Sequence, residues 1–167
     1  MKNNIVLIGM PGAGKSTVGV LLAKAISYDF MDTDLVIQKN TGKKLYEIIN
    51  EHGMEAFLSI ENDVLKQILA NKTVIATGGS AVFGEEAMEH LRDMATIVYI
   101  KLSCDEILRR VKNIKTRGIA MKKGKTLEDV YYERIPLYEK YADIVVECDN
   151  MTIEDSVFAI MKAYEQA

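Results

Sequence analysis

Residues 9–16 read GMPGAGKS and fit the pattern G-x-x-x-x-G-K-[ST], which is typical of loops that bind phosphate groups. Glycines let such a loop curl until several backbone N–H groups point at phosphate oxygens, and the helix that follows adds the positive end of its dipole. Lys15 is long enough to reach the β- and γ-phosphates, and the Ser16 hydroxyl is a suitable magnesium ligand. The loop therefore predicts binding of a nucleoside triphosphate with magnesium. The expected nucleotide contacts are Gly12, Ala13, Gly14, Lys15, Ser16 and Thr17.

Two carboxylates follow in the stretch Asp32-Thr33-Asp34. A triphosphate site needs a carboxylate for its metal ion, and no acidic residue follows the apolar strand pattern at residues 73–76. We therefore assign Asp32 to magnesium, and Asp34 to the hydroxyl of an acceptor as a base or an orienting group. The alternative is that Asp34 only caps a helix that begins at Leu35.

Two further segments have the composition of a ligand site. Gly78-Gly79 follows the strand pattern at residues 73–76, where glycines either permit close approach of the backbone to a ligand or form a tight turn. Residues 113–125 are basic, contain glycine and lack periodicity. That composition suits a mobile lid over phosphates, and it also suits a solvated basic loop.

Strand patterns alternate with helical patterns along the whole chain. Strands are predicted at residues 5–8, 29–31, 73–76, 96–101 and 143–147. Helices are predicted at residues 18–26, 35–40, 45–51, 55–69, 85–92, 105–111, 127–141 and 153–164. The alternation predicts a three-layer α/β/α fold, with a five-stranded parallel sheet covered by helices on both faces, in one domain of residues 1–167. Ligands bind at the carboxyl ends of the strands in such sheets, so we expect the glycine loop, residues 32–34 and residues 78–80 to meet in one crevice.

The bulk composition argues against several classes of protein. A chain of 167 residues with a net charge of −3 is ordinary for a globular protein and poorly suited to general nucleic-acid binding. The first apolar run ends in the glycine loop, so we expect neither a signal peptide nor a membrane association. Cys104 and Cys148 lack metal-ligand and disulfide spacing, which favours the cytoplasm. We expect a monomer whose partner is a small-molecule substrate.

Together these motifs resemble those of the shikimate kinases, a family of P-loop proteins similar to the nucleoside monophosphate kinases. The resemblance covers roughly residues 4–165. It rests on residues 9–19, 30–34, 53–57 with Glu61, 77–79, Arg117, 133–138 and 142–143.

The resemblance implies a P-loop kinase fold and transfer of the γ-phosphate of ATP to a hydroxyl of shikimate, a step of aromatic amino acid biosynthesis. It implies that Lys15, Asp34 and Arg117 are the catalytic residues. Arg117 would reach the transferring phosphate from a lid at about residues 112–125, and Arg110 is expected near the nucleotide.

The resemblance also implies an acceptor site, within about residues 33–61 and the segments that face them. Asp34 would contact the acceptor's hydroxyls, and the backbone of Gly78 and Gly79 would contact the acceptor. Arg134 would grip the carboxylate of the acceptor.

Three positions of the acceptor site and lid depart from the family pattern. Leu58 stands where the family has an arginine, Ser80 stands where it has a third glycine, and residues 117–120 read RGIA in place of arginine-proline-leucine-leucine. Lys43 and Lys44 precede a helix and have the length to reach the site, but their spacing does not show whether they do. These departures leave open a related kinase for another small hydroxy acid, such as homoserine or a sugar acid. A third hypothesis is a nucleotide-binding regulatory module without catalysis.

Overall fold

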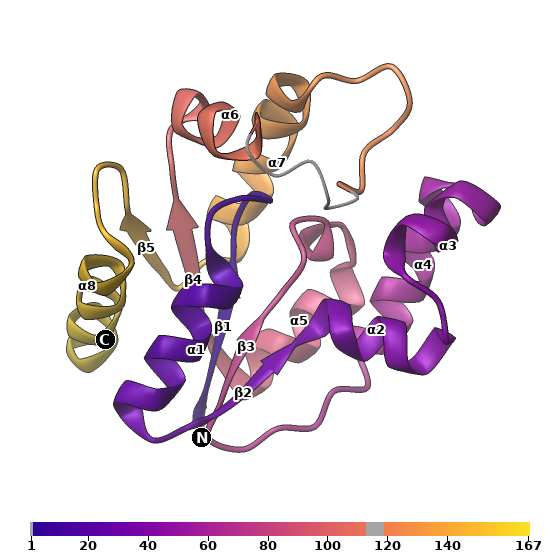
Figure 1. Ribbon diagram of the computed structural model, residues 1–167. Helices are drawn as coiled ribbons and strands as arrows, with labels where there is room; N and C mark the ends of the chain where they lie inside the picture. Colours follow the sequence, from indigo (N-terminus) through magenta and orange to yellow (C-terminus); the bar gives the residue numbers. More distant parts are fainter. Residues whose placement is uncertain (1, 113–118) are drawn as a thin grey trace.

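The computed structural model describes residues 2–112 and 119–167, which form a five-stranded parallel sheet between layers of helices (Figure 1). The strands are β1 (Asn4–Ile8), β2 (Asp29–Asp32), β3 (Thr73–Ala76), β4 (Ala95–Lys101) and β5 (Ile144–Glu147). Their order across the sheet is β2-β3-β1-β4-β5, and all neighbouring pairs are parallel. The predicted fold class is therefore confirmed.

The strands at the centre of the sheet are the most apolar because both of their faces are covered. Every residue of β1 and β3 is buried, and Val6 of β1 pairs with Ile75 of β3 and Ile97 of β4. The edge strands β2 and β5 keep several exposed or half-buried residues. The chain leaves β1 toward β2 on one side and later returns to β4 on the other, so the topological switch point lies at the carboxyl end of β1.

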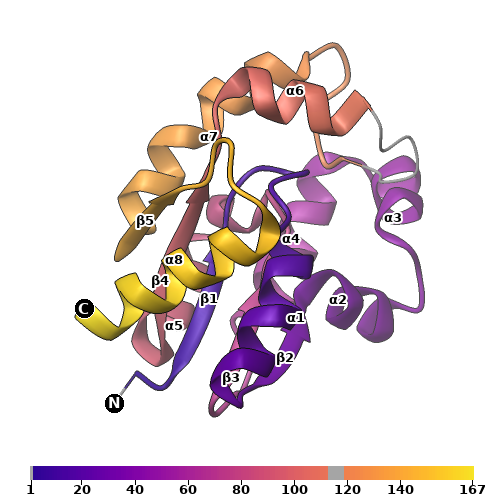
Figure 2. The same ribbon diagram turned by 60° about the vertical axis from the view of Figure 1, so that its left-hand side comes forward.

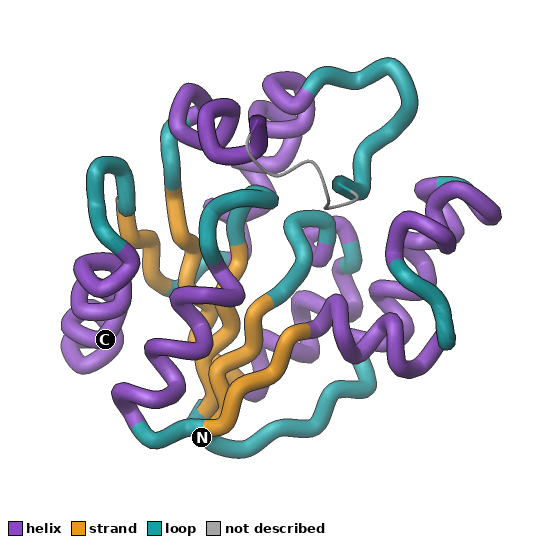
Figure 3. The backbone as a smooth tube through the Cα atoms, viewed as in Figure 1, coloured by secondary structure: helices purple, strands orange, loops and turns teal. Residues whose placement is uncertain are grey.

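The helices form two layers and one lobe. They are α1 (Lys15–Ile26), α2 (Thr33–Thr41), α3 (Leu45–His52), α4 (Met54–Leu65), α5 (Glu85–Met94), α6 (Cys104–Lys112), α7 (Leu127–Tyr141) and α8 (Ile153–Gln166), with a short 3₁₀ helix η1 (Ala81–Phe83). α1 and α8 pack together on one face of the sheet, while α5 and α7 lie behind it (Figure 2). α2, α3 and α4 form a lobe beside the carboxyl ends of β2 and β3, as Figure 3 shows.

One predicted helix is shorter in the structure. We expected a helix over residues 55–69, but α4 ends at Leu65. Its last turn tightens, because the backbone N–H of Gln67 donates to the Val64 carbonyl at 3.2 Å and that of Ile68 donates to the Leu65 carbonyl at 3.2 Å. As a result Leu69, which the helical pattern placed on the apolar stripe, is 86 % exposed.

Helix α7 spans Leu127–Tyr141 as predicted, and it includes Pro136, where the sequence predicts a kink or a new turn. Its start is fixed by a capping box, in which the backbone N–H of Asp129 donates to the Thr126 hydroxyl and the N–H of Thr126 donates to the Asp129 carboxylate. None of the helices in the described residues combines the length and the apolar character needed to cross a bilayer.

Candidate active site

A cavity of about 370 Å³ opens at the carboxyl ends of β1, β2 and β3. The segments that follow these three strands line it, including the start of α2, together with parts of α3, α4 and α7. Its lining includes the predicted site residues Gly12, Gly14, Lys15, Ser16, Asp32, Asp34, Gly78, Gly79, Ser80 and Arg134. The predicted meeting of the glycine loop, residues 32–34 and residues 78–80 is therefore confirmed, and the parallel strand order explains why these distant segments converge.

The glycine loop ends where α1 begins. Gly14 is the N-cap of α1 and has φ 85°, a left-handed conformation that a residue with a side chain adopts only under strain. Gly14, Lys15 and Ser16 line the cavity, so the start of α1 and the positive end of its dipole face it. Lys15 is buried, and its Nζ donates to the carbonyls of Gly9 at 2.7 Å and Met10 at 2.8 Å. Its ammonium thus lies inside the loop that the sequence pattern assigns to phosphates.

Asp32 connects the phosphate loop to the start of α2. The Ser16 hydroxyl donates to Oδ2 of Asp32 at 2.9 Å, and the backbone N–H of Asp34 donates to Oδ1 of Asp32 at 2.9 Å. Asp32 is therefore the N-cap of α2. The alternative that Asp34 caps this helix is wrong, because Asp34 lies in its first turn and lines the cavity.

The neighbouring oxygens of Ser16 and Asp32 fit a magnesium ion bound with a nucleotide. Magnesium prefers hard oxygen ligands and usually takes one or two carboxylates, with phosphates and water completing its shell. Within the described ranges, no group of three or more His, Cys, Asp or Glu side chains is placed to hold a metal. The Ser16 hydroxyl and the Asp32 carboxylate are oxygen donors of the kind that magnesium takes beside phosphates.

The glycine pair after β3 lies between a carboxylate and a guanidinium. A β-carbon at Gly78 would lie 2.8 Å from Oδ1 of Asp34, and one at Gly79 would lie 3.0 Å from Nη1 of Arg134. A side chain at either position would crowd these two groups. The Tyr138 hydroxyl donates to the Gly79 carbonyl at 2.6 Å, which fixes the position of the glycine backbone.

Arg134 is a buried cation on the wall of the cavity, with only 2 % of its surface exposed. Its Nη2 donates to the Ala120 carbonyl, and its guanidinium lies 5.4 Å from the centre of the Phe83 ring. Nε and Nη1 are buried without a hydrogen bond to any described residue. Unsatisfied guanidinium donors at a cavity wall are well suited to a carboxylate, which accepts two parallel hydrogen bonds from arginine.

Glu61 is a second buried ionisable residue, and it is 2 % exposed. It lies beside Gly78, close to Asp34. The Ser80 hydroxyl donates to its Oε1 at 2.7 Å. Burial raises the pKa of Glu61 to about 7; the Ser80 hydrogen bond opposes this rise, the charge of Asp34 adds to it, and the charge of Arg134 opposes it. Sequence reasoning assigned Glu61 no role. The available signal was its place four residues after Phe57, on the buried side of α4.

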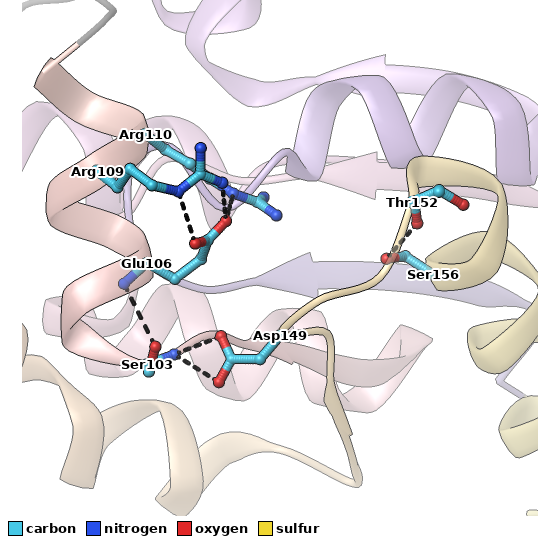
Figure 4. Close-up of polar contacts among 7 residues, drawn as sticks. All are labelled: Ser103, Glu106, Arg109, Arg110, Asp149, Thr152 and Ser156. Atoms are coloured by element: carbon cyan, nitrogen blue, oxygen red, sulfur yellow. Dashed lines mark hydrogen bonds and ion pairs between the residues drawn. The ribbon is translucent and has the colours of Figure 1, made fainter.

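Helix α6 lies beside the phosphate loop. A β-carbon at Gly14 would lie 4.0 Å from Nη1 of Arg110, which places this side chain beside the start of α1. Nε of Arg110 donates to Oε1 of Glu106 at 2.8 Å, and Arg109 contacts the same carboxylate (Figure 4). Hydrogen bonds from Arg109 and Arg110 lower the pKa of Glu106 to about 2. Arg110 is thus oriented near the loop, while its contact with a nucleotide stays a prediction.

The start of α6 is tied to the segment that follows β5. The backbone N–H of Ser103 donates to both carboxylate oxygens of Asp149, at 3.0 and 3.2 Å, and the Ser103 hydroxyl accepts from the N–H of Glu106 (Figure 4). Nearby, the Ser156 hydroxyl donates to the Thr152 carbonyl in the first turn of α8. These contacts hold α6 against the carboxyl edge of the sheet.

Comparison with known proteins agrees with this geometry. A family model described as "Shikimate kinase" matches residues 11–165. This chain belongs to the shikimate kinase family. A shikimate kinase of Thermodesulfovibrio yellowstonii is 37% identical over 166 residues, which cover 98% of this chain and 95% of that protein.

Solved shikimate kinases have the same fold. The enzyme from Acinetobacter baumannii, solved in complex with shikimate, has a TM-score of 0.86 and 28% identity, with 99% of this chain and 94% of that chain covered. The enzyme from Aquifex aeolicus has a TM-score of 0.80 and 32% identity, with 97% and 96% covered.

Five of the predicted site residues are not among the described residues that line the cavity. Ala13 is buried inside the phosphate loop, and Thr17 is exposed in the first turn of α1. Leu58, at the position where the shikimate kinase pattern has arginine, is half-buried and packs against the hydrophobic core. Arg110 lies beside the loop, as described above. Arg117 lies outside the described residues, and its role stays a prediction.

The structure decides between the two lysines that the sequence left open. Lys44 lines the cavity, whereas Lys43 forms an ion pair with Glu51 on the outside of the lobe. Tyr46, which sequence reasoning did not consider, lines the cavity next to Lys44.

Proposed function

We propose that this protein transfers the γ-phosphoryl group of ATP to a hydroxyl of shikimate. The observation that carries the proposal is that one cavity brings two groups of residues together. A phosphate loop with Lys15 lies at one end, and Asp34 and the buried Arg134 lie at the other. Membership of the shikimate kinase family supports ATP as the donor, and the relative solved with shikimate supports this acid as the acceptor.

At the phosphate end, catalysis consists of positioning the triphosphate and stabilising negative charge. Backbone N–H groups at the start of α1 bind phosphate oxygens, and Lys15 turns its ammonium to the transferring phosphate. Magnesium bound through Ser16 and Asp32 would neutralise further charge on the phosphates. Arg110 from α6 and Arg117 from the lid add positive charge on the nucleotide side.

At the acceptor end, Asp34 accepts a hydrogen bond from the reacting hydroxyl, orients it toward the phosphate, and takes up its proton. Arg134 binds the carboxylate of the acid, since its Nε and Nη1 are the buried donors that lack a bond to described residues. Gly78 and Gly79 let the acceptor approach the backbone between these two side chains.

The test is a coupled assay of ADP release with magnesium and ATP, in which shikimate, homoserine and gluconate are offered as acceptors. We expect turnover on shikimate at sub-millimolar concentration and little on the other two. No turnover on shikimate at millimolar concentration would contradict the proposal, and turnover on another acid would identify the related kinase instead. Absence of turnover on every acceptor would favour a regulatory module.

Lys15→Ala tests the phosphate end in the same assay. Because charge stabilisation is nearly all that a protein supplies in phosphoryl transfer, we expect turnover to fall by more than about tenfold. Asp34→Asn tests the acceptor end and should also abolish most turnover, while leaving nucleotide binding intact. A variant of Lys15 that kept more than about a tenth of the wild-type rate would count against the assignment.

A further inference from the structure

Three cationic residues line the cavity within the described ranges, and one of them has no role so far. Lys15 is held by carbonyls of the phosphate loop, and Arg134 lies at the acceptor end. Lys44 is the residue that precedes α3, and it lines the cavity on the side of the lobe formed by α2, α3 and α4. Its Nζ lies 6.0 Å from the centre of the Tyr46 ring, and Tyr46 lines the same cavity.

No acid of the described residues lies within ion-pair distance of the Lys44 ammonium. Lys43, the adjacent residue with the same charge, pairs with Glu51 and does not line the cavity. Across the described ranges, none of the ion pairs involves Lys44. The backbone N–H of Lys44 donates to Oε2 of Glu47 at 2.7 Å, which fixes the start of α3 and leaves the long side chain at the cavity.

Negative charges in the cavity repel an acid that enters it. Asp32 and Asp34 already line the cavity, and a triphosphate adds further negative charge. Leu58, where the family pattern has arginine, contributes an apolar side chain that packs on the core. Lys15 is held by the phosphate loop, so a carboxylate bound by Arg134 has Lys44 as the other cation of the described lining that is available to it.

We propose that Lys44 is a specificity-determining residue that supplies the second positive charge for the carboxylate of the acceptor. The inference rests on the proposed function. Arg134 binds the carboxylate through directed hydrogen bonds from a buried position, and Lys44 attracts it as a point charge from the half-open lobe side. Because Lys44 is exposed, its contribution is moderate and is screened by salt.

Lys44→Met removes the charge and keeps most of the length of the side chain. We expect the KM for shikimate to rise about threefold to tenfold, with kcat and the KM for ATP changed by less than about twofold. Lys44→Arg should restore a KM near that of the wild type. Lys43→Met is the matched control, since it makes the same change of charge one residue away, and it should leave the KM for shikimate within about twofold.

Two further measurements separate a charge contact from a structural effect. The methyl ester of shikimate lacks the negative charge, so Lys44→Met should not weaken its binding, and high salt should raise the KM of the wild type more than that of the variant. If Lys44→Met raises the KM for the acid and for the ester by the same factor, the inference is overturned.

In a Leu58→Arg background, which we expect to bind shikimate about tenfold tighter, Lys44→Met should raise the KM for shikimate by a smaller factor than it does in the wild type. If Lys44→Met raises the KM by the same factor in both backgrounds, Lys44 and the arginine at position 58 do not act on the same carboxylate, which contradicts the inference.

The proposed function and this inference fail in different ways. If the wild-type protein does not phosphorylate shikimate, the proposed function is wrong and the inference falls with it. If the wild type is active and Lys44→Met has an unchanged KM for shikimate, only the role of Lys44 is wrong.

Discussion

At the scale of single residues, the acceptor end of the cavity places a buried acid beside a buried base. Glu61 and Arg134 are each 2 % exposed, and Asp34 and Ser80 lie next to them. Desolvation disfavours the charged form of Glu61, so its pKa rises to about 7 from an ordinary value of 4.5. The protonation of one carboxyl group thus becomes linked to the stability of the fold.

Glu61→Gln tests this linkage. Between pH 4.5 and about 7 the folded protein keeps a proton on Glu61 that the unfolded chain has released, so the free energy of unfolding falls as the pH rises. The fall amounts to roughly 3 kcal/mol and ends above the folded pKa. Glutamine does not titrate, so the variant should gain stability relative to the wild type from pH 5 to pH 8.

Urea unfolding of both proteins across this pH range provides the measurement. Glu55→Gln, a change at an exposed acid in the first turn of the same helix, is the control and should run parallel to the wild type. If the free energy of unfolding of Glu61→Gln also changes with pH as that of the wild type does, Glu61 does not hold the extra proton.

At the scale of elements, helix α7 determines the geometry of the acceptor end. Its residues Arg134 and Tyr138 are one turn apart, are both buried, and contact the same glycine segment after β3. Tyr131, on the same helix, donates its hydroxyl to the Leu102 carbonyl at 2.7 Å, which anchors α7 to the end of β4. Burial raises the pKa of Tyr138, so its hydroxyl stays a donor at neutral pH.

Tyr138→Phe removes the hydrogen bond that holds the Gly79 carbonyl. The buried carbonyl loses its donor, so we expect a loss of about 1–2 kcal/mol in the free energy of unfolding. The glycine segment should also become less well positioned, which raises the KM for the acceptor and leaves the KM for ATP unchanged. Thermal unfolding and steady-state kinetics measure the two effects.

Tyr132→Phe serves as the control for this change. Tyr132 is 60 % exposed on the same helix, and the loss of its hydroxyl should alter neither stability nor kinetics appreciably. An unchanged stability of Tyr138→Phe would mean that the contact with Gly79 contributes nothing to the fold.

At the scale of the whole molecule, one buried polar side chain links three strands at the end of the sheet opposite the cavity. Asn4 is 1 % exposed; its Nδ2 donates to the carbonyls of Ala70 at 3.1 Å and Met94 at 3.0 Å, and its Oδ1 accepts from the N–H of Thr73 at 3.0 Å. The amide thus joins the starts of β1, β3 and β4. This arrangement supports the strand order on which the site depends, at a distance from the site itself.

Asn4→Ala should destabilise the protein without changing its chemistry. One buried and two part-buried backbone groups lose their partner, so we expect the free energy of unfolding to fall by about 2–4 kcal/mol. Below the melting temperature, KM and kcat should stay those of the wild type. Asn3→Ala is the control, because Asn3 makes an exposed hydrogen bond to Asn71 and its loss should cost little. A drop in kcat for folded Asn4→Ala would show that this end of the sheet influences the site.

Much of this architecture was predictable because its determinants are short in range. The phosphate loop places its glycines, Lys15 and Ser16 within eight residues of chain, and the strand that precedes it has a continuous apolar pattern. Alternating strand and helix patterns predict a parallel sheet, and the rule that ligands bind at the carboxyl ends of the strands then brings Asp34 and Gly78 to the loop. Local periodicity and one general rule were sufficient for these features.

Other features depended on packing between distant segments, which no local pattern encodes. Only the tertiary structure places Lys44 rather than Lys43 at the cavity, because the start of α3 turns one side chain toward Glu51 and the other inward. It also buries Glu61 against Ser80 and makes Asp32 the cap of α2. Spacing along the chain therefore determined the phosphate end of the site. The charges of the acceptor end were decided by how α3, α4 and α7 pack around the glycine segment, because burial and proximity are properties of the assembled fold.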